Sequence, residues 1–229
     1  MRSSASARAA AALAVTVLIT AGVAGAADAA KGGNGGGGGK GGGKPPKNTT
    51  TTTTTTTGTS AIEAAHADVC PKVSEYTSCG ALTVTIKDFG NVGWAGYAHP
   101  ANGSIDYNSY FNASQSAWSN VVAHEVGGHL DTWNEIVARV GATQAWTDYY
   151  DIDAFAVPWA TARWSAVKGT SRSFSTGDAK EAYLDCAGPV THGYQGNYLY
   201  TWGLSTTAQQ QSFCTGHTNV LEQALTLSR

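Results

Sequence analysis

From residue 61 onward the sequence predicts an α+β domain, with a small sheet first and a mostly helical part after it. Segments in which apolar and polar residues alternate lie before residue 110, and segments with helical spacing follow them. Strands and helices do not alternate as they do in a parallel α/β fold. All seven tryptophans and all ten tyrosines of the chain lie after residue 60, and these side chains can fill the core of one domain.

The chain before this domain has the features of an export signal followed by a tether. Residues 1–29 combine two early arginines, an apolar run and small residues near Ala26 and Ala29, which indicates a secretory signal peptide. The apolar run is shorter than the roughly 20 residues that span a bilayer, so we expect no transmembrane anchor. Residues 30–60 are rich in glycine and threonine and have almost nothing to bury, which predicts a disordered tether.

We therefore expect a secreted, extracellular protein with one globular domain at residues 61–229. The lysines of the tether favour association with an anionic cell wall or surface, and a solubilising spacer is the alternative. The globular part has eight lysines and arginines against fifteen aspartates and glutamates, a net charge of −7. This balance argues against a nucleic-acid partner. We expect the domain to be a monomer.

The first elements of the domain are predicted to be strands. Residues 81–89 alternate apolar and polar side chains and are rich in β-branched types, which is typical of a strand. Residues 94–107 are rich in glycine and aromatic residues and have a turn sequence at 100–103. They predict a hairpin at an edge of the sheet, with a short second strand at 104–107.

A helix follows the hairpin. Asn112 and Ser114 are typical N-cap residues, and apolar residues then recur with helical spacing as far as Val126. The later part of the chain is helical in character, and breaks are expected at Gly141 and Pro158.

Another break is expected at residues 168–178. The helix predicted next, at 178–188, begins near Asp178 and ends at Gly188 and Pro189. The tail predicts one or two more helices.

Four cysteines in an exported chain suggest disulfides. Of the three possible arrangements we favour Cys70 with Cys79 and Cys186 with Cys214, because each pair closes a short local loop. A zinc site made of all four cysteines is the alternative, but the chain has no CxxC pair.

The sequence HEVGGH has the residue types of a zinc hydrolase helix at an unusual spacing. In HExxH enzymes two histidines one turn apart face one metal, and the intervening glutamate activates water. Here His124 and His129 are five residues apart, which in a regular helix rotates the second side chain by about 140° from the first. A one-residue π-bulge at Gly127 and Gly128 would correct this rotation. The alternative is a helix that stops at Gly127, with ordinary polar histidines.

Two acidic residues further along provide a partner for this motif. Glu181 and Asp185 are one helical turn apart and therefore project from one face of the helix predicted there. In a site of two histidines and a carboxylate, one acid can bind the metal while the other accepts a hydrogen bond from a ligating histidine.

The combination of HEVGGHLD with a downstream ExxxD resembles the gluzincin clan of zinc metallopeptidases. The first segment is similar to the motif of lethal-factor-like peptidases, with the second histidine one place later, and to the HExxGH motif of dipeptidyl peptidase III proteins. The resemblance covers residues 121–131 and 178–188 and extends to the hairpin at 94–107, which is placed like the edge strand that aligns substrate. It implies a zincin-like fold, with a small N-terminal sheet, an active-site helix and a mostly helical C-terminal part.

The resemblance also implies roles for individual residues. His124, His129 and Glu181 correspond to the zinc ligands, Glu125 to the general base, and Asp185 to a group that supports a ligand. Zn2+ would lower the pKa of a bound water to about 7, and Glu125 would transfer its proton to the leaving amine.

A hydrogen-bond donor to the transition state is also expected. His192, Tyr194 and Tyr183 are the candidates because they lie near the ligand helix in sequence. Asp131 is expected to be structural, or to replace Glu181 as a ligand.

Two further histidines and one acidic cluster each have both a functional and a structural interpretation. His99 and His217 are candidate donors or metal-binding residues, although a lone histidine is more often a satisfied polar group. The acidic cluster at 148–153 is a candidate calcium site, but it lacks the spacing of an EF-hand, and a solvated acidic segment is the favoured reading.

The leading hypothesis is a secreted zinc metallopeptidase that acts on a peptide or protein substrate. The alternatives are a catalytically inert zincin-fold module that binds a surface, in which the late His129 abolishes tight zinc binding, and a zinc amidase that acts on cell-wall material.

Overall fold

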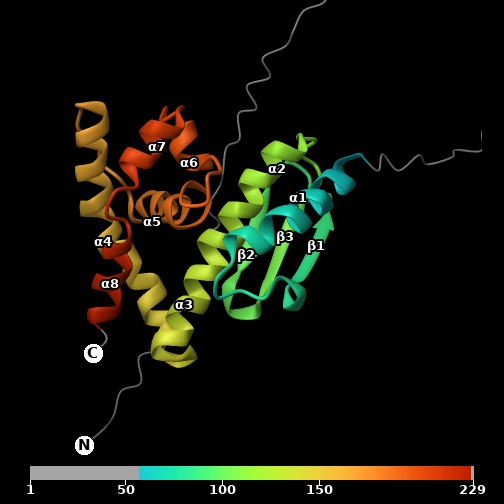
Figure 1. Ribbon diagram of the computed structural model, residues 1–229, viewed down its shortest axis with the longest axis horizontal. Coiled ribbons are helices and arrows are strands. Elements are labelled where there is room, and N and C mark those ends of the chain that lie inside the picture. The colour runs from blue at the N-terminus through green and yellow to red at the C-terminus, as the bar shows by residue number, and fades with distance from the viewer. Residues whose placement is uncertain (1–56, 228–229) are drawn as a thin grey trace, which may run out of the picture.

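The computed structural model describes residues 57–227 and confirms the α+β class. Within these residues the protein is mostly helical, with one small mixed sheet (Figure 1). The expected signal peptide and nearly all of the expected tether lie outside the described residues. Helix α1 (Thr57–Val73) begins before residue 61, so the last residues assigned to the tether belong to a helix that the sequence analysis did not predict.

The sheet contains the strand and the hairpin that the sequence predicts. Its strands are β1 (Thr83–Lys87), β2 (Gly96–His99) and β3 (Ser104–Asn108), in the order β1-β3-β2. β3 pairs in parallel with β1 and antiparallel with β2, so β2 is an edge strand. A short 3₁₀ turn, η2 (Pro100–Asn102), and Gly103 at φ 60° connect the hairpin, where glycine avoids the steric cost of a positive φ.

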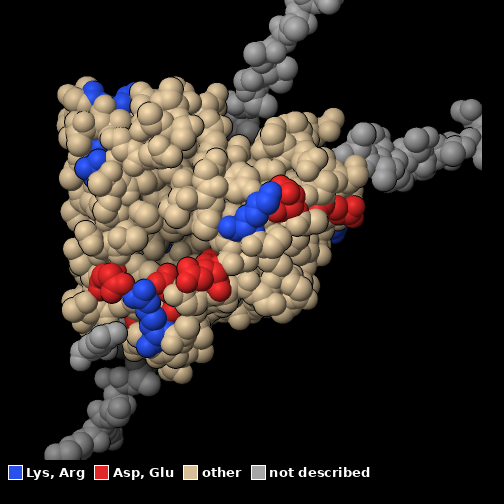
Figure 2. Space-filling model, viewed as in Figure 1, with Lys and Arg blue, Asp and Glu red and all other residues tan. Residues whose placement is uncertain are grey.

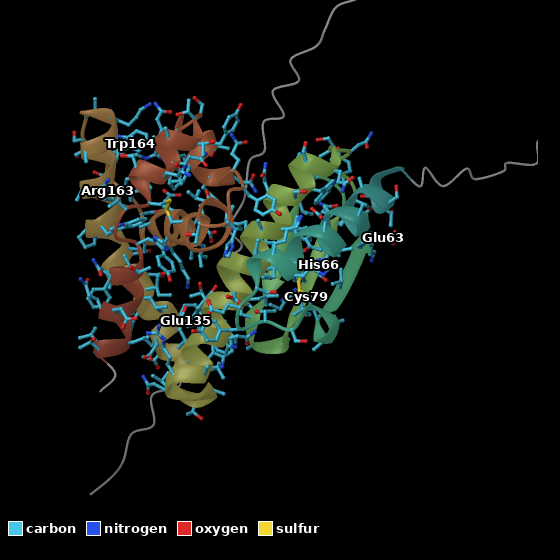
Figure 3. All side chains as sticks on the ribbon, viewed as in Figure 1. Glu63, His66, Cys79, Glu135, Arg163 and Trp164 are labelled. Carbon is cyan, nitrogen blue, oxygen red and sulfur yellow. A yellow bond between two sulfur atoms is a disulfide. The ribbon has the colours of Figure 1, made fainter. Side chains whose placement is uncertain are left out.

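The N-terminal core lies between this sheet and helices α1 and α2 (Gln115–Val122), which cross it on one side (Figure 1). His66 on α1, labelled in Figure 3, shares a hydrogen bond with Tyr107 on β3, with 3.0 Å between its Nδ1 and the tyrosine hydroxyl oxygen. The Cys70–Cys79 disulfide, visible at the labelled Cys79, joins α1 to the turn η1 (Cys79–Ala81), as predicted.

One continuous helical segment connects the two halves of the protein. Ser114 caps α2 by accepting a hydrogen bond from the amide of Ala117, as its cap-type sequence predicts. The segment continues through the π-helix η3 (Ala123–Leu130) into α3 (Asp131–Val140). Gly141, at φ 84°, ends it where the break was predicted.

The C-terminal half consists of helices around a second core. They are α4 (Ala142–Lys168), α5 (Thr176–Asp185), the π-helix η4 (Cys186–Val190), α6 (Asn197–Thr201), α7 (Thr207–Phe213) and α8 (Thr218–Thr226). The predicted Cys186–Cys214 disulfide ties η4 to the residue that follows α7. The tail, for which one or two helices were predicted, contains α7 and α8.

The break predicted at Pro158 is wrong, because α4 runs through it for 27 residues. Proline removes one backbone hydrogen bond from a helix interior. Ile152, Ala156 and Ala160 on the same helix are fully buried in the C-terminal core, and this packing stabilises the helix across the proline.

The end predicted at Gly188 and Pro189 is also wrong. Helix α5 ends at Asp185, but the helical backbone continues as η4 through both residues to Val190. Gly188 is buried against η3. Because it has no side chain, the two backbones can approach closely, and the glycine does not end the helix.

The surface carries few charges on the face shown in Figure 2. Acidic and basic side chains lie together near the centre and at the lower left of this face, and separate basic side chains lie at its upper left; most of the face is formed by other residues (Figure 2). Within residues 57–227, no helix combines the length and apolarity needed to cross a bilayer.

The two halves meet where η3 and η4 pack backbone to backbone. A Cβ atom added at Gly188 would lie 2.4 Å from the amide nitrogen of Gly128 and 2.5 Å from the carbonyl oxygen of Ala123. One added at Gly128 would lie 2.9 Å from the carbonyl oxygen of Leu184. Only glycine permits this approach on both sides.

Replacing Gly188 with alanine should therefore destabilise the protein by at least about 1–3 kcal/mol, the usual cost of overpacking, because backbone atoms must move apart. Gly177→Ala is the matched control, since this helical glycine has no neighbouring atom within 4 Å of the added Cβ. It should be neutral or slightly stabilising. Urea unfolding followed by circular dichroism measures both. Equal stabilities for the two variants would contradict the packing argument.

Candidate metal centre

The π-helix brings His129 to the same side of the segment as His124. In a π-helix each amide bonds to the carbonyl five residues earlier, and the amide of Asp131 does so with Val126. Residues five apart then lie on one face, and the two imidazole rings are 5.0 Å apart between centroids. The predicted local bulge is thus present as an eight-residue π segment, and the alternative of a helix that stops at Gly127 is wrong.

Three side chains converge at this point. His124 Nε2 lies 3.1 Å from Glu181 Oε2, and His129 Nε2 lies 3.5 Å from the same oxygen. Potential ligand atoms of the three residues all lie within 4.8 Å of one another, which is close enough to hold one metal ion. Among the described residues this is the one cluster of histidine, cysteine and acidic side chains that meets this criterion.

The other nitrogen of each histidine has its own partner. His124 Nδ1 lies 2.8 Å from Asp185 Oδ1, and the second oxygen of Asp185 accepts a hydrogen bond from the amide of Leu199. His129 Nδ1 lies 2.7 Å from the hydroxyl of Tyr149. These contacts fix both rings with Nε2 directed at Glu181, the orientation that metal-binding histidines require.

The charges at this point are buried and coupled. His124, Glu125, Glu181 and Asp185 are all at most 6% exposed. Burial lowers the pKa of His124, but its hydrogen bonds to Asp185 and Glu181 outweigh burial and raise that pKa well above the ordinary value. Burial raises the pKa of Glu181, yet the two histidines lower it more, to well below its usual range. The buried carboxylates therefore favour a positive charge beside them, such as the proton on His124.

Glu125 lies between this cluster and the edge of the sheet. Its Oε2 accepts a hydrogen bond of 2.9 Å from the backbone amide of Ala98 on β2. The strand approaches so closely that a Cβ added at Gly96 would lie 2.6 Å from Cγ of Glu125. Burial raises the pKa of Glu125, which makes its carboxylate a better proton acceptor.

Two of the expected hydrogen-bond donors lie in another cavity. Tyr183 and His192 line a cavity of about 260 Å³ whose wall includes Asp131 and Glu135 but none of the three converging residues. Tyr194 packs against the N-terminal core.

The tyrosines beside the cluster are Tyr149 and Tyr198, which the sequence analysis did not select. Tyr149 contacts His129, and the ring of Tyr198 lies 5.4 Å from that of His124. Burial, and then the charge of Glu181, raise the pKa of both tyrosines well above the ordinary value, so both keep their hydroxyl protons.

The acidic segment at 148–153 is only partly solvated, and its Tyr149 lies beside this site. It lies within α4, where Asp148 is fully buried and Asp153 lies 3.6 Å from the ammonium group of Lys180. The placement of Tyr149 depends on how α4 packs on α3 and α5, and the sequence has no local signal for that packing.

The remaining polar candidates make structural contacts. The carboxylate of Asp131 accepts hydrogen bonds from the backbone amides of residues 75–77 and so holds the chain after α1. His99 pairs with Asp106 at 3.1 Å, and His217 contacts the carbonyl of Cys214 at 2.9 Å. These contacts agree with the structural role expected for Asp131 and with His99 and His217 as hydrogen-bonded polar groups.

Comparison of the chain with models of protein families, with curated proteins and with solved structures finds no match. The geometry of the site therefore carries the functional argument.

Neutral substitutions of Glu181 and Asp185 should lower metal affinity by different amounts. Glu181→Gln should lower metal affinity by more than Asp185→Asn, because the first change removes a charged ligand atom. The second weakens only the support of His124, which typically costs about 10- to 100-fold in affinity. Titration against a chromophoric chelator measures both.

The matched control is Asp106→Asn, another carboxylate that contacts a histidine, but outside the site. Its metal affinity should equal that of the unmodified protein. A larger loss in Asp185→Asn than in Glu181→Gln would mean that the roles of the two acids are reversed.

Proposed function

We propose that the protein is a secreted zinc metallopeptidase of the gluzincin type, in which His124, His129 and Glu181 hold Zn2+. The observation that carries the proposal is the convergence of both Nε2 atoms on one oxygen of Glu181, with the carboxylate of Glu125 beside them. Two imidazoles and one carboxylate form the protein ligand set of a catalytic zinc site, which keeps one position open.

The spacing of the ligand atoms supports this metal. Ligands about 2.0–2.2 Å from a tetrahedral zinc lie about 3.4 Å from one another. The 3.1 Å and 3.5 Å separations of the two Nε2 atoms from Glu181 Oε2 fit this value. Zinc supplies Lewis acidity there, which activates water at neutral pH.

The residues of the chain provide the other parts of the reaction. Glu125 is the group that accepts a proton from the attacking water and delivers it to the leaving amine. The hydrogen bond from Ala98 holds its carboxylate in place, which reduces the cost of orienting the base.

Tyr149 would hold His129 in the orientation that a ligand needs. When His129 uses Nε2 as a ligand, its Nδ1 carries the proton and donates to the Tyr149 oxygen. This contact fixes the ring with Nε2 directed at Glu181, in a site where burial strengthens each hydrogen bond.

The edge strand supports a peptide substrate. The amide of Ala98 points away from β3, since it donates to Glu125. In an antiparallel pair these directions alternate, so the backbone groups of Gly96 also point outward. An extended peptide can add to such an edge by main-chain hydrogen bonds.

Export is supported by the two disulfides, which leave no cysteine free and are typical of proteins outside the cytosol. In the inert surface-binding alternative the late His129 abolishes tight zinc binding. Its position beside Glu181 favours the catalytic alternative.

Peptide hydrolysis tests the proposal. The purified protein should cleave a mixed peptide library, and a chelator should stop the cleavage. Glu125→Gln should lower the rate by a factor of about 10²–10⁴ and keep stoichiometric zinc, because the base is lost and no ligand is. Mass spectrometry of the products and metal analysis measure the two quantities.

Glu135→Gln is the matched control, a glutamate on the same continuous helix that lines the other cavity. It should keep the full rate. Undiminished cleavage by Glu125→Gln, or cleavage of cell-wall amides and of no peptide, would contradict the proposed function.

A further inference from the structure

A second cavity adjoins the metal centre at the end of the edge strand. It has a volume of about 190 Å³ and lies between the β2–β3 turn and the start of α4. Its walls include five aromatic side chains, from Tyr97, Trp133, Trp146, Tyr149 and Tyr150. The proposed function uses one of them, Tyr149.

Two residues belong both to this cavity and to the contacts of the metal centre. Tyr149 lines the cavity with its side chain and places its hydroxyl 2.7 Å from His129 Nδ1. Ala98 also lines it and donates its amide to Glu125. The cavity is therefore contiguous with the place where a bond would be cut.

The rings form an enclosure rather than a flat platform. Trp133 meets Trp146 and Tyr149 edge to face, at centroid distances of 5.0 and 5.6 Å, and Tyr149 meets Tyr150 in the same way at 6.0 Å. Trp146 and Tyr150 lie nearly parallel at the rim, with an interplanar angle of 10°.

These two rim side chains are about half exposed. Trp146 is 49% exposed and Tyr150 is 56% exposed. Neighbouring exposed aromatic rings beside a cavity are typical of a binding surface. The cavity is smaller than the roughly 300–1,000 Å³ pockets that take whole small molecules, so its size fits one side chain.

The direction of β2 gives the position of that side chain in a peptide. The strand runs from Gly96 to His99, and the cavity begins at its later residues and continues into the turn at residues 100–102. Antiparallel pairing is the more stable arrangement for an added strand. The N-terminal side of the peptide then lies toward the turn, and its C-terminal side toward Gly96.

We propose that this cavity is a specificity subsite for an aromatic side chain on the N-terminal side of the bond that is cut. This inference rests on the proposed function, since it takes the occupant to be a peptide substrate. The ring edges and faces of the walls match the geometry that aromatic pairs prefer.

Cleavage of a mixed peptide library by the full-length, zinc-loaded protein tests the subsite. Phenylalanine, tyrosine or tryptophan should exceed alanine by at least about tenfold at one position on the N-terminal side of the cut, as a filled apolar pocket predicts. Trp146→Ala and Tyr150→Ala should each reduce this preference to below about threefold. Tyr110→Ala, which removes an equally exposed aromatic ring outside the cavity, should retain it.

A binding measurement separates failure of the subsite from failure of the proposed function. The zinc-loaded Glu125→Gln protein is titrated with two short peptides that differ only by phenylalanine or alanine. Tighter binding of the phenylalanine peptide, lost in the Glu125→Gln, Trp146→Ala double variant, supports the subsite even if no peptide is cleaved. In that case the proposed peptidase activity alone fails.

Three results would overturn the subsite. One is cleavage without an aromatic preference, which leaves the proposed function standing. Another is a preference confined to the C-terminal side of the cut. The third is tighter binding of an N-acetylglucosamine oligomer than of the phenylalanine peptide, which would assign the aromatic cavity to a glycan.

Discussion

The contact between the π-helices η3 and η4 is the constraint on which the rest of the structure depends. Glycines 127, 128 and 188 let two backbones approach to a distance that excludes any Cβ. Because η4 continues α5, this approach sets Glu181 and Asp185 opposite His124. The π geometry of η3 then turns His129 toward the same point. One backbone contact thus determines both the joining of the two cores and the position of every proposed ligand.

The site concentrates buried charge where the N-terminal and C-terminal cores meet. Three carboxylates, from Glu125, Glu181 and Asp185, are buried beside two imidazoles. Each buried ion costs several kcal/mol unless a partner compensates it. A proton on His124, whose pKa is raised by its hydrogen bonds to Asp185 and Glu181, supplies part of this compensation. A divalent cation held by neutral imidazoles would supply it instead. Because burying these charges costs desolvation free energy, the arrangement is a poor way to stabilise a fold, but it is well suited to holding a metal.

Local sequence patterns predicted the parts of the protein that local physics determines. The alternation in residues 81–89, the turn at 100–103 and the cap at Ser114 all gave elements that the structure contains. The spacing of HEVGGH gave the π geometry, because only that backbone brings both histidines to one face. The breaks predicted at Pro158 and at Gly188 and Pro189 are absent, since packing against the C-terminal core stabilises helical backbone through both prolines. Tyr149 and the aromatic cavity depend on contacts between α3, α4 and the hairpin, which are distant in sequence and have no local signature.

Anomalous diffraction at the zinc edge, from crystals of the full-length chain grown with zinc, tests the central claim most directly. The account predicts one strong peak about 2.0–2.2 Å from Nε2 of His124, Nε2 of His129 and a carboxylate oxygen of Glu181. A structure with zinc bound and His129 directed away from it, or with Asp131 in place of Glu181, would contradict the account.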